Sequence, residues 1–371
     1  MMILYSLLGL VMILSASSIA AVLRYGVPSS HFFTRQGVFL SIAFIFGFLF
    51  ILRIPTKKYK YFAYLFVLAV VGGLLGLYIY GRISNGALSW YRVGFISLQP
   101  SEFAKPVLVL LMAVFYDRSL KRKEPSYYNL IPIGIALVIF ALVARQPDLG
   151  GALIIAFIVF FTFIKIPMDK AFKSKMLKFV ALGAAIVGVA FLFGGDKLLN
   201  SYQLERLTFK NPCSRYSEST GYQVCNGYIA INNGGLFGAG LGNSTQKYLY
   251  LPEAHTDFIF PILVEELGLL IGILVLVGFA FMLYRILKIA KQTTNVRNFI
   301  LAYGAFLYML SHLVVNLLGV LAIIPLTGVP LPFLSYGSSF NISLICMLFV
   351  VQRVAYENKT EQAKKELLTL K

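Results

Sequence analysis

The sequence predicts an all-α, polytopic membrane protein of about ten transmembrane helices, with a large extracytoplasmic loop between the seventh and the eighth. Hydrophobic residues make up 58% of the 371 residues and charged residues 13%. The mean hydropathy of +0.79 lies well outside the usage of soluble proteins. Apolar runs such as 62–81 and 273–283 are long enough, with their flanks, to cross a bilayer.

The chain is expected to cross the membrane ten times. The first apolar run follows Met1 without a basic n-region or a convincing small-residue cleavage site, so it is interpreted as a retained helix and not as a signal peptide. The expected spans are 2–22, 36–53, 62–80, 101–117, 128–144, 149–165, 177–194, 260–284, 299–322 and 336–353.

Basic residues set the expected orientation. Of the 33 Lys and Arg residues, 22 lie in the five segments 53–60, 117–124, 165–178, 285–297 and 353–371. This bias puts both termini in the cytoplasm. The net charge of +18 is then explained by this bias and by contact with anionic lipid, and nucleic-acid binding is not expected, because the charge is spread over short connections. Residues 1–371 are expected to form one integral membrane domain with a cytoplasmic tail of about 354–371. The cytoplasmic ends are too short to contain a soluble enzymatic domain.

The connection 195–259 is long, polar and rich in glycine, and loops of this length are usually functional or disordered. Its aromatic and aliphatic content favours an ordered cap. The glycines of GGLFGAGLG match no nucleotide-binding motif, so they predict tight turns, with contact to a lipid-linked phosphate as the alternative. Cys213 and Cys225 share this loop, where a local disulfide and two free thiols are equally compatible with the sequence.

Ionisable groups at the rims of membrane helices are costly and usually functional. In LQPSEFAKP, Glu102 and Lys105 are three positions apart and share a helix face, which predicts a pair facing the bundle interior or a wet cavity. In ARQPDLGGA, Arg145 and Asp148 lie at a hairpin tip, although Asp148 also suits a helix N-cap. Arg35 begins the second span, where an interfacial anchor explains it equally well.

The segment PLTGVPLPFLSYGSS combines three prolines with two glycines between the last two spans. Irregular backbone at membrane depth is tolerated where it lines a cavity. We therefore expect this segment to border the substrate, with Ser335 and Tyr336 as substrate-binding residues.

The stretch YLYLPEAHTDFIF places Glu253, His255 and Asp257 within five residues, directly before the eighth span. Asp257 lies near the positive end of that helix, where a capping role is its simpler explanation. Dipole stabilisation likewise explains Glu265 and Glu266 in the following turns. Three titratable groups crowded on one membrane edge favour chemistry, with Asp257 as the reacting group and Glu253 and His255 as substrate-binding neighbours.

The chain resembles the SEDS family of FtsW, RodA and SpoVE type proteins over nearly its whole length. The resemblance is carried by the motifs quoted above, by NGALSWYRVGFISLQPSEFAK and by the EELG that follows YLYLPEAHTDFIF. The stretch around YLYLPEAHTDFIF is more similar to the FtsW branch than to the RodA branch. The resemblance implies a peptidoglycan glycosyltransferase of the bacterial cytoplasmic membrane that polymerises lipid II, an undecaprenyl-pyrophosphoryl disaccharide-pentapeptide, for division or elongation. It implies that Asp257 is catalytic and that Glu102, Lys105 and Asp148 belong to the site. It also implies a class B penicillin-binding protein as transpeptidase partner, among other divisome or elongasome proteins.

The chemistry expected is inverting glycosyl transfer on the extracytoplasmic side, with Asp257 as general base. Lys105, with Arg145 or Arg35, would hold the pyrophosphate, while Glu102 and Asp148 orient these cations or bind acceptor hydroxyls. A divalent cation, Mg or Mn, on the pyrophosphate is compatible with this scheme, but the sequence shows no ligand cluster and no cofactor is assigned. Two alternatives stay open: a lipid II flippase, and a non-catalytic scaffold.

Overall fold

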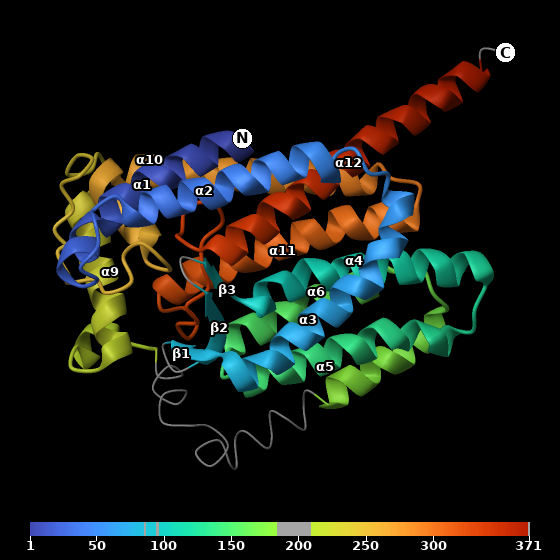
Figure 1. Ribbon diagram of the computed structural model, residues 1–371, viewed down its shortest axis with the longest axis horizontal. Helices are drawn as coiled ribbons and strands as arrows, with labels where there is room; N and C mark the ends of the chain where they lie inside the picture. The colour runs from blue at the N-terminus through green and yellow to red at the C-terminus, as the bar shows by residue number, and fades with distance from the viewer. Residues whose placement is uncertain (85–86, 94–95, 184–208, 370–371) are drawn as a thin grey trace.

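The computed structural model describes residues 1–84, 87–93, 96–183 and 209–369, and long helices lying side by side dominate it (Figure 1). The helices are α1 (Met2–Leu23), α2 (His31–Phe46) with the π-helical turn η1 (Gly47–Ile51), α3 (Lys60–Tyr80), α4 (Pro100–Arg122), α5 (Ile131–Arg145), α6 (Leu149–Lys165), α9 (Ser219–Gly234), α10 (Ile259–Lys291), α11 (Val296–Val320) and α12 (Ser338–Thr369). Short 3-10 turns cover Thr56–Tyr59, Ser126–Leu130 and Pro212–Arg215.

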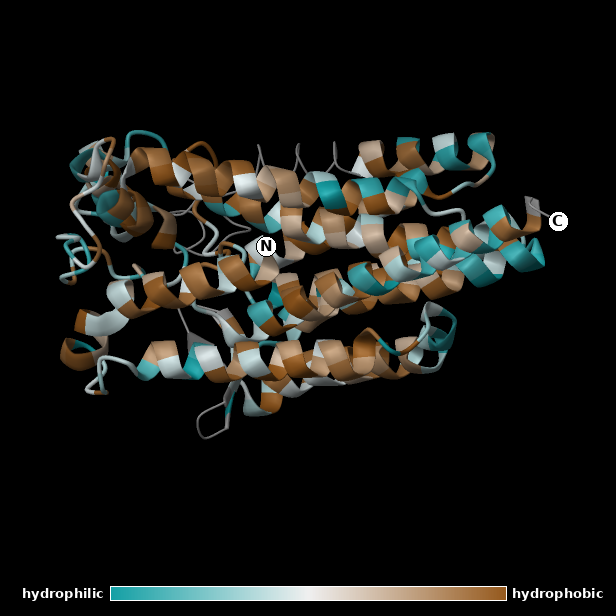
Figure 2. Ribbon diagram, turned by 90° about the horizontal axis from the view of Figure 1, so that it is seen from above, coloured by the Kyte–Doolittle hydropathy of each residue, from teal (hydrophilic) through white to brown (hydrophobic). Residues whose placement is uncertain are grey.

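The predicted class of a helical, polytopic membrane protein is confirmed. Within the described ranges, seven helices are long and apolar enough to cross a membrane, and α6 is a shorter apolar helix. Apolar residues cover the middle of the helices and hydrophilic ones gather toward the ends (Figure 2). The expected span 177–194 lies mostly outside the described residues, so the number ten stays a prediction. The expected tail continues α12 as a helix that extends beyond the bundle (Figure 1).

Helix α11 is the centre of the bundle and contacts α4, α6, α10 and α12. Apolar residues such as Leu301 and Tyr308 are buried along it, as expected of a helix that is hydrophobic on most of its circumference. The same helix carries the buried polar side chains of His312 and Asn316. A buried polar group must be hydrogen-bonded or it destabilises the fold, so these two residues mark where the bundle interior becomes polar.

A small antiparallel sheet, which the prediction of an all-α fold did not include, precedes α4. Strands β1 (Arg82–Ser84), β2 (Ala87–Val93) and β3 (Ile96–Leu98) pair in the order β1-β2-β3. The Tyr91 hydroxyl donates a 2.6 Å hydrogen bond to the Gly73 carbonyl of α3. The backbone N–H of Gln99 donates to Ser339 Oγ at 2.9 Å. The Ser338 hydroxyl of α12 also donates to the Ser97 carbonyl of β3 at 3.0 Å, so the sheet links α3 to the start of α12.

Helix α10 is broken at Gly268, whose φ of 88° is left-handed, a conformation that glycine adopts without steric cost. The break frees backbone groups that the glycine-rich segment after α9 satisfies. The Leu269 amide donates to the Gly235 carbonyl at 2.9 Å, and the Gly240 amide donates to the Glu266 carbonyl at 3.0 Å. The expected tight turns of this segment are present. They attach the loop that precedes α10, which was expected to be extracytoplasmic and is here called the outer loop, to α10.

Candidate functional site

Asp257 lies just before α10 begins, and it is only 7% exposed. The hydroxyl of Thr256 lies 2.9 Å from Asp257 Oδ1 and 2.8 Å from Glu253 Oε2. A hydroxyl has one hydrogen to donate, so the two carboxylates compete for it. The edge that the sequence singled out thus holds two acidic groups around one shared donor.

Two other segments fix the backbone of this edge. Asn316 of α11 donates through Nδ2 to the carbonyls of Asp257 and Val329, both at 2.8 Å. Ser335 Oγ donates to the Thr256 carbonyl at 2.6 Å. The segment 325–339 between α11 and α12 is here called the Pro-rich segment, and residues 253–257 are called the Asp257 edge. The buried hydroxyl of Ser335, which was expected to contact substrate, instead holds the Pro-rich segment against the Asp257 edge.

His255 and Tyr336 also meet at this edge. The Tyr336 amide donates to the His255 carbonyl at 2.9 Å, and the Phe32 ring of α2 lies 4.6 Å from the His255 ring and 5.0 Å from the Tyr336 ring. Burial, and then the positive charge of Arg24, lower the pKa of His255 to about 4. His255 is consequently a neutral imidazole within an aromatic cluster at neutral pH.

Arg35 lies one turn after Phe32 in α2 and is half-buried. Its guanidinium donates a 2.6 Å hydrogen bond to Ser97 Oγ of β3, while its Nε has no hydrogen-bond partner within the described part of the chain. Ser338, at the start of α12, donates to the Ser97 carbonyl at 3.0 Å. The structure thus brings Arg35 to the same edge as Tyr336, and the Nε–H of Arg35 remains available as a hydrogen-bond donor.

Glu102 and Lys105 form the expected pair, with 2.6 Å between Lys105 Nζ and Glu102 Oε1. Both side chains are nearly inaccessible, at 6% and 1% exposure. The sequence did not indicate that His312 of α11 would join them, with its Nε2 at 3.2 Å from Lys105 Nζ. The Phe340 ring stacks on His312 at 4.2 Å. The pair therefore faces the bundle interior, where it connects α4 to α11.

Asp148 caps α6, which was the alternative interpretation of this residue. Its Oδ1 accepts from the Gly151 amide at 2.8 Å, and its Oδ2 accepts from Ser101 Oγ at 3.2 Å. Arg145 is exposed and makes no ion pair with any other residue in the described ranges. The two residues of the predicted hairpin tip do not act as a pair.

The segment 327–329 lies between the start of α6 and Asp257. A side-chain carbon at Gly150 of α6 would lie 3.0 Å from Thr327, and one at Gly328 would lie 3.8 Å from Asp257 Oδ2. Gly150 allows the Pro-rich segment to approach the start of α6 closely, and Gly328 adopts a left-handed backbone with a φ of 69° as the segment passes Asp257. The capped end of α6 is thus a close neighbour of the candidate site.

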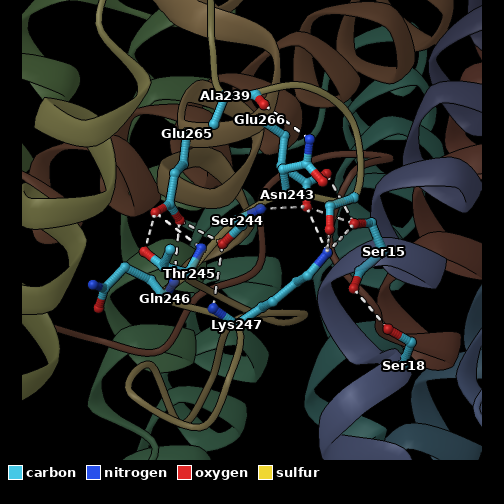
Figure 3. Close-up of polar contacts among 11 residues, drawn as sticks. Ser15, Ser18, Ala239, Asn243, Ser244, Thr245, Gln246, Lys247, Glu265 and Glu266 are labelled. Carbon is cyan, nitrogen blue, oxygen red and sulfur yellow. Dashed lines mark hydrogen bonds and ion pairs between the residues drawn. The ribbon is translucent and has the colours of Figure 1, made fainter.

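A second polar centre lies about two turns after Asp257 in α10, around Glu265 and Glu266 (Figure 3). Their local sequence predicts a helix-dipole effect only. The Glu265 carboxylate accepts hydrogen bonds from Ser244 Oγ, from Thr245 Oγ1 at 2.8 Å and from the Thr245 amide at 3.2 Å. Asn233 of α9 donates to it at 3.2 Å. The carboxylate organises the loop before the Asp257 edge, a role beyond the helix-dipole effect expected from the sequence.

Glu266 points toward α1 in the same close-up (Figure 3). Lys247 Nζ lies 3.0 Å from its Oε1, with side-chain exposures of 4% and 0% for the two partners. Ser15 of α1 donates to the same carboxylate at 2.6 Å. This ion pair, which we call the Lys247–Glu266 clamp, holds the outer loop between α1 and α10. The local sequence around Lys247 does not predict this ion pair.

The outer loop is cross-linked near its beginning. A disulfide joins Cys213 to Cys225 of α9, with 4.9 Å between the Cα atoms. In the described ranges, His, Cys, Asp and Glu side chains form no group of three or more that could hold a metal ion.

Comparison with known proteins finds one family throughout. The family described as cell cycle protein, of the FtsW, RodA and SpoVE type, matches residues 1–360. The chain is 37% identical to the probable peptidoglycan glycosyltransferase FtsW of Bacillus subtilis, covering 96% of this chain and 89% of that protein. It is 33% identical to the stage V sporulation protein E of the same organism, covering 93% and 91%.

Solved structures agree with this. The Thermus thermophilus rod shape determining protein RodA superposes with a TM-score of 0.65 and 25% identity, covering 96% of this chain and 95% of that one. A chain from a structure described as "Structural coordination of polymerization and crosslinking by a peptidoglycan synthase complex" gives a TM-score of 0.73 and 25% identity, covering 96% of both.

Proposed function

Because this chain belongs to the family of FtsW, RodA and SpoVE type cell cycle proteins, we propose that it is a peptidoglycan glycosyltransferase that polymerises lipid II at the outer face of the cytoplasmic membrane. Its similarity to proteins named as probable peptidoglycan glycosyltransferases extends along 95–96% of the chain. Cell division and cell elongation are both compatible with this activity.

The reaction joins two lipid-linked disaccharides. The 4-hydroxyl of the acceptor GlcNAc attacks the anomeric carbon of the donor MurNAc, the new glycosidic bond forms, and the bond to the lipid pyrophosphate breaks. Inversion at the anomeric carbon needs one base to take the hydroxyl proton and positive groups to stabilise the departing pyrophosphate.

Asp257 is the proposed base. The observation that carries this role is its carboxylate at the membrane edge, with the backbone held by Asn316 and one oxygen beside Thr256. A base placed on fixed elements can accept a proton without prior rearrangement. Lipid II keeps its tail in the bilayer and its sugars just outside, so the reacting hydroxyl meets the protein at this height.

Among the described residues, Arg35 is the cation to which we assign contact with the pyrophosphate. It lies on the edge shared with Tyr336 and retains an unpartnered Nε within the described residues. Lys105 is enclosed by Glu102 and His312, so we assign this buried group to holding α4 against α11. Asp148 supports the site by capping α6, and Arg145 is an exposed cation available to the substrate.

A class B penicillin-binding protein is the proposed partner. The similarity to a chain of a peptidoglycan synthase complex that couples polymerisation to crosslinking supports it. A transpeptidase that crosslinks the emerging glycan must act on the side where the strand forms, which is the side we assign to Asp257. Both termini are then cytoplasmic, in agreement with the distribution of basic residues.

The test uses purified protein, with and without its transpeptidase partner, and labelled lipid II. Asp257→Asn retains size and hydrogen bonding but removes the base, so glycan ladders should appear about 10²–10⁴-fold more slowly. Asp169→Asn is a matched control, since this exposed residue caps a helix by accepting from the Phe172 amide, which Asn can also do. Wild-type polymerisation by Asp257→Asn would refute the assignment, and lipid II transport without any ladder would favour a flippase.

A further inference from the structure

A cavity of about 1240 Å³ lies between α1, α2, α10 and α12, at the end of α10 remote from Asp257. Its walls include Phe48 and Phe281, which remain 57% and 49% exposed. The volume exceeds the roughly 300–1,000 Å³ typical of small-molecule sites. We call this cavity the basal groove. It is large, apolar and accessible from outside the bundle.

The wall contributed by α2 has an unusual backbone. The π-helical turn η1, Gly47–Ile51, carries Phe48 and Leu49 into the lining. A side-chain carbon at Gly47 would collide with the ring of Phe349, so the glycine lets α12 approach this turn closely. Single π-helical turns occur frequently at functional sites, and this one shapes the groove.

Two basic side chains lie on the lining of the basal groove, Arg285 of α10 and Lys359 of α12. Neither makes a hydrogen bond or ion pair with another residue of the described ranges. The lining contains no Asp or Glu, although it includes amides such as Gln292. Elsewhere on α12 a basic residue is neutralised, since Arg353 pairs with Glu357 at 3.1 Å. The groove therefore combines apolar walls with positive charge that lacks a counter-charge in the protein.

We propose that the basal groove binds one anionic phospholipid of the membrane, with its acyl chains against the phenylalanine walls and its phosphate between Arg285 and Lys359. Basic pockets between transmembrane helices bind lipid head groups in this way. An apolar partner helix would pack against the apolar walls but would leave both basic side chains unpaired. An anionic lipid supplies acyl chains for the walls and a negative phosphate for the basic side chains. The groove also lies at the end of the bundle where basic connections gather, which is the end expected to face anionic lipid.

Lipid binding is measured directly by native mass spectrometry of the full-length protein in detergent, titrated with equimolar dioleoyl-phosphatidylglycerol and dioleoyl-phosphatidylcholine. One phosphatidylglycerol should be retained in preference to phosphatidylcholine. The double variant Arg285→Gln/Lys359→Gln should weaken phosphatidylglycerol binding by about 30-fold, from two lost charges. The control Lys57→Gln/Lys58→Gln removes two exposed charges from the connection that follows η1 and should leave this affinity unchanged.

Equal retention of the two lipids by the wild type would overturn the proposal, and so would an equal loss of affinity in the control. A lipid-free dimer that the Arg285 and Lys359 substitutions leave intact would instead make the groove an interface between copies. If the double variant does not fold, the salt dependence of lipid binding by the wild type tests the proposal. The affinity for phosphatidylglycerol must fall as the NaCl concentration rises, while the affinity for phosphatidylcholine stays constant. None of these readouts requires polymerisation.

Discussion

Removing the cation of the Lys247–Glu266 clamp should open the outer loop while leaving the bundle folded. Lys247→Met retains the length and apolar stem of the side chain but deletes its charge. Glu266 is then a carboxylate with 0% side-chain exposure and without its cation. The hydroxyl of Ser15, at 2.6 Å, remains as a donor but carries no charge.

The expected size follows from this burial. Removing one partner of a buried ion pair destabilises by about 3–5 kcal/mol, because the other charge stays uncompensated. At 1.36 kcal/mol per tenfold change, the loop should open about 10²–10⁴ times more often. Replacing both partners removes the stranded charge, so Lys247→Met/Glu266→Gln should recover most of the loss. The two substitutions are then strongly non-additive.

Amide hydrogen exchange of residues 244–251 measures this opening. Exchange should accelerate in Lys247→Met, return toward the wild type in the double variant, and stay unchanged in Lys210→Met, which removes an exposed lysine from the same loop. Amide exchange in α11 reports on the stability of the helix bundle and should be the same in all these variants as in the wild type. If Lys247→Met exchanged at the wild-type rate, or if the double variant opened as readily as the single one, the clamp would have no role in holding the loop.

Three other outcomes are expected. Lys105→Met strands a buried carboxylate on Glu102 and should cost about 3–5 kcal/mol in unfolding experiments; unchanged stability would contradict a buried pair. Because the folded pKa of His255 is about 4 and its unfolded pKa about 6.5, only the unfolded state gains a proton as pH falls from 6.5 to 4. Stability should drop by about 3 kcal/mol over this window, and His255→Phe should abolish the drop. Reducing the Cys213–Cys225 disulfide should accelerate proteolysis near α9 but not within α11, and bundle-wide unfolding on reduction would refute a local role.

Much of the fold could be predicted because apolar length is a strong signal in a membrane protein. The expected span 149–165 coincides with α6, and 2–22 differs from α1 by one residue. The cap of α6 could also be anticipated, since Asp148 precedes an apolar run. The pairing of Glu102 with Lys105 followed from helical spacing alone.

The rest depends on contacts between distant segments. His312 joins the Glu102–Lys105 pair across 207 positions, and nothing in its local sequence indicates this. Strands β1 to β3 are short, and β2 is stabilised by the hydrogen bond between Tyr91 and α3. The break at Gly268 is equally hidden, because one glycine in an apolar helix ordinarily costs only about 1 kcal/mol and predicts no pairing with another loop.

These long-range contacts would allow a residue outside any helix to serve as the proposed base. The Asp257 edge is attached to α11 through Asn316 and to the Pro-rich segment through Ser335. The loop before it is attached to α10 and α1 through the Lys247–Glu266 clamp. Since catalytic groups must be held within a fraction of an ångström of their working positions, each attachment removes a motion that would move Asp257 away from the acceptor hydroxyl. We therefore expect the clamp to influence the rate of polymerisation without touching substrate, and loop opening and lost activity should vary together across the Lys247 and Glu266 variants.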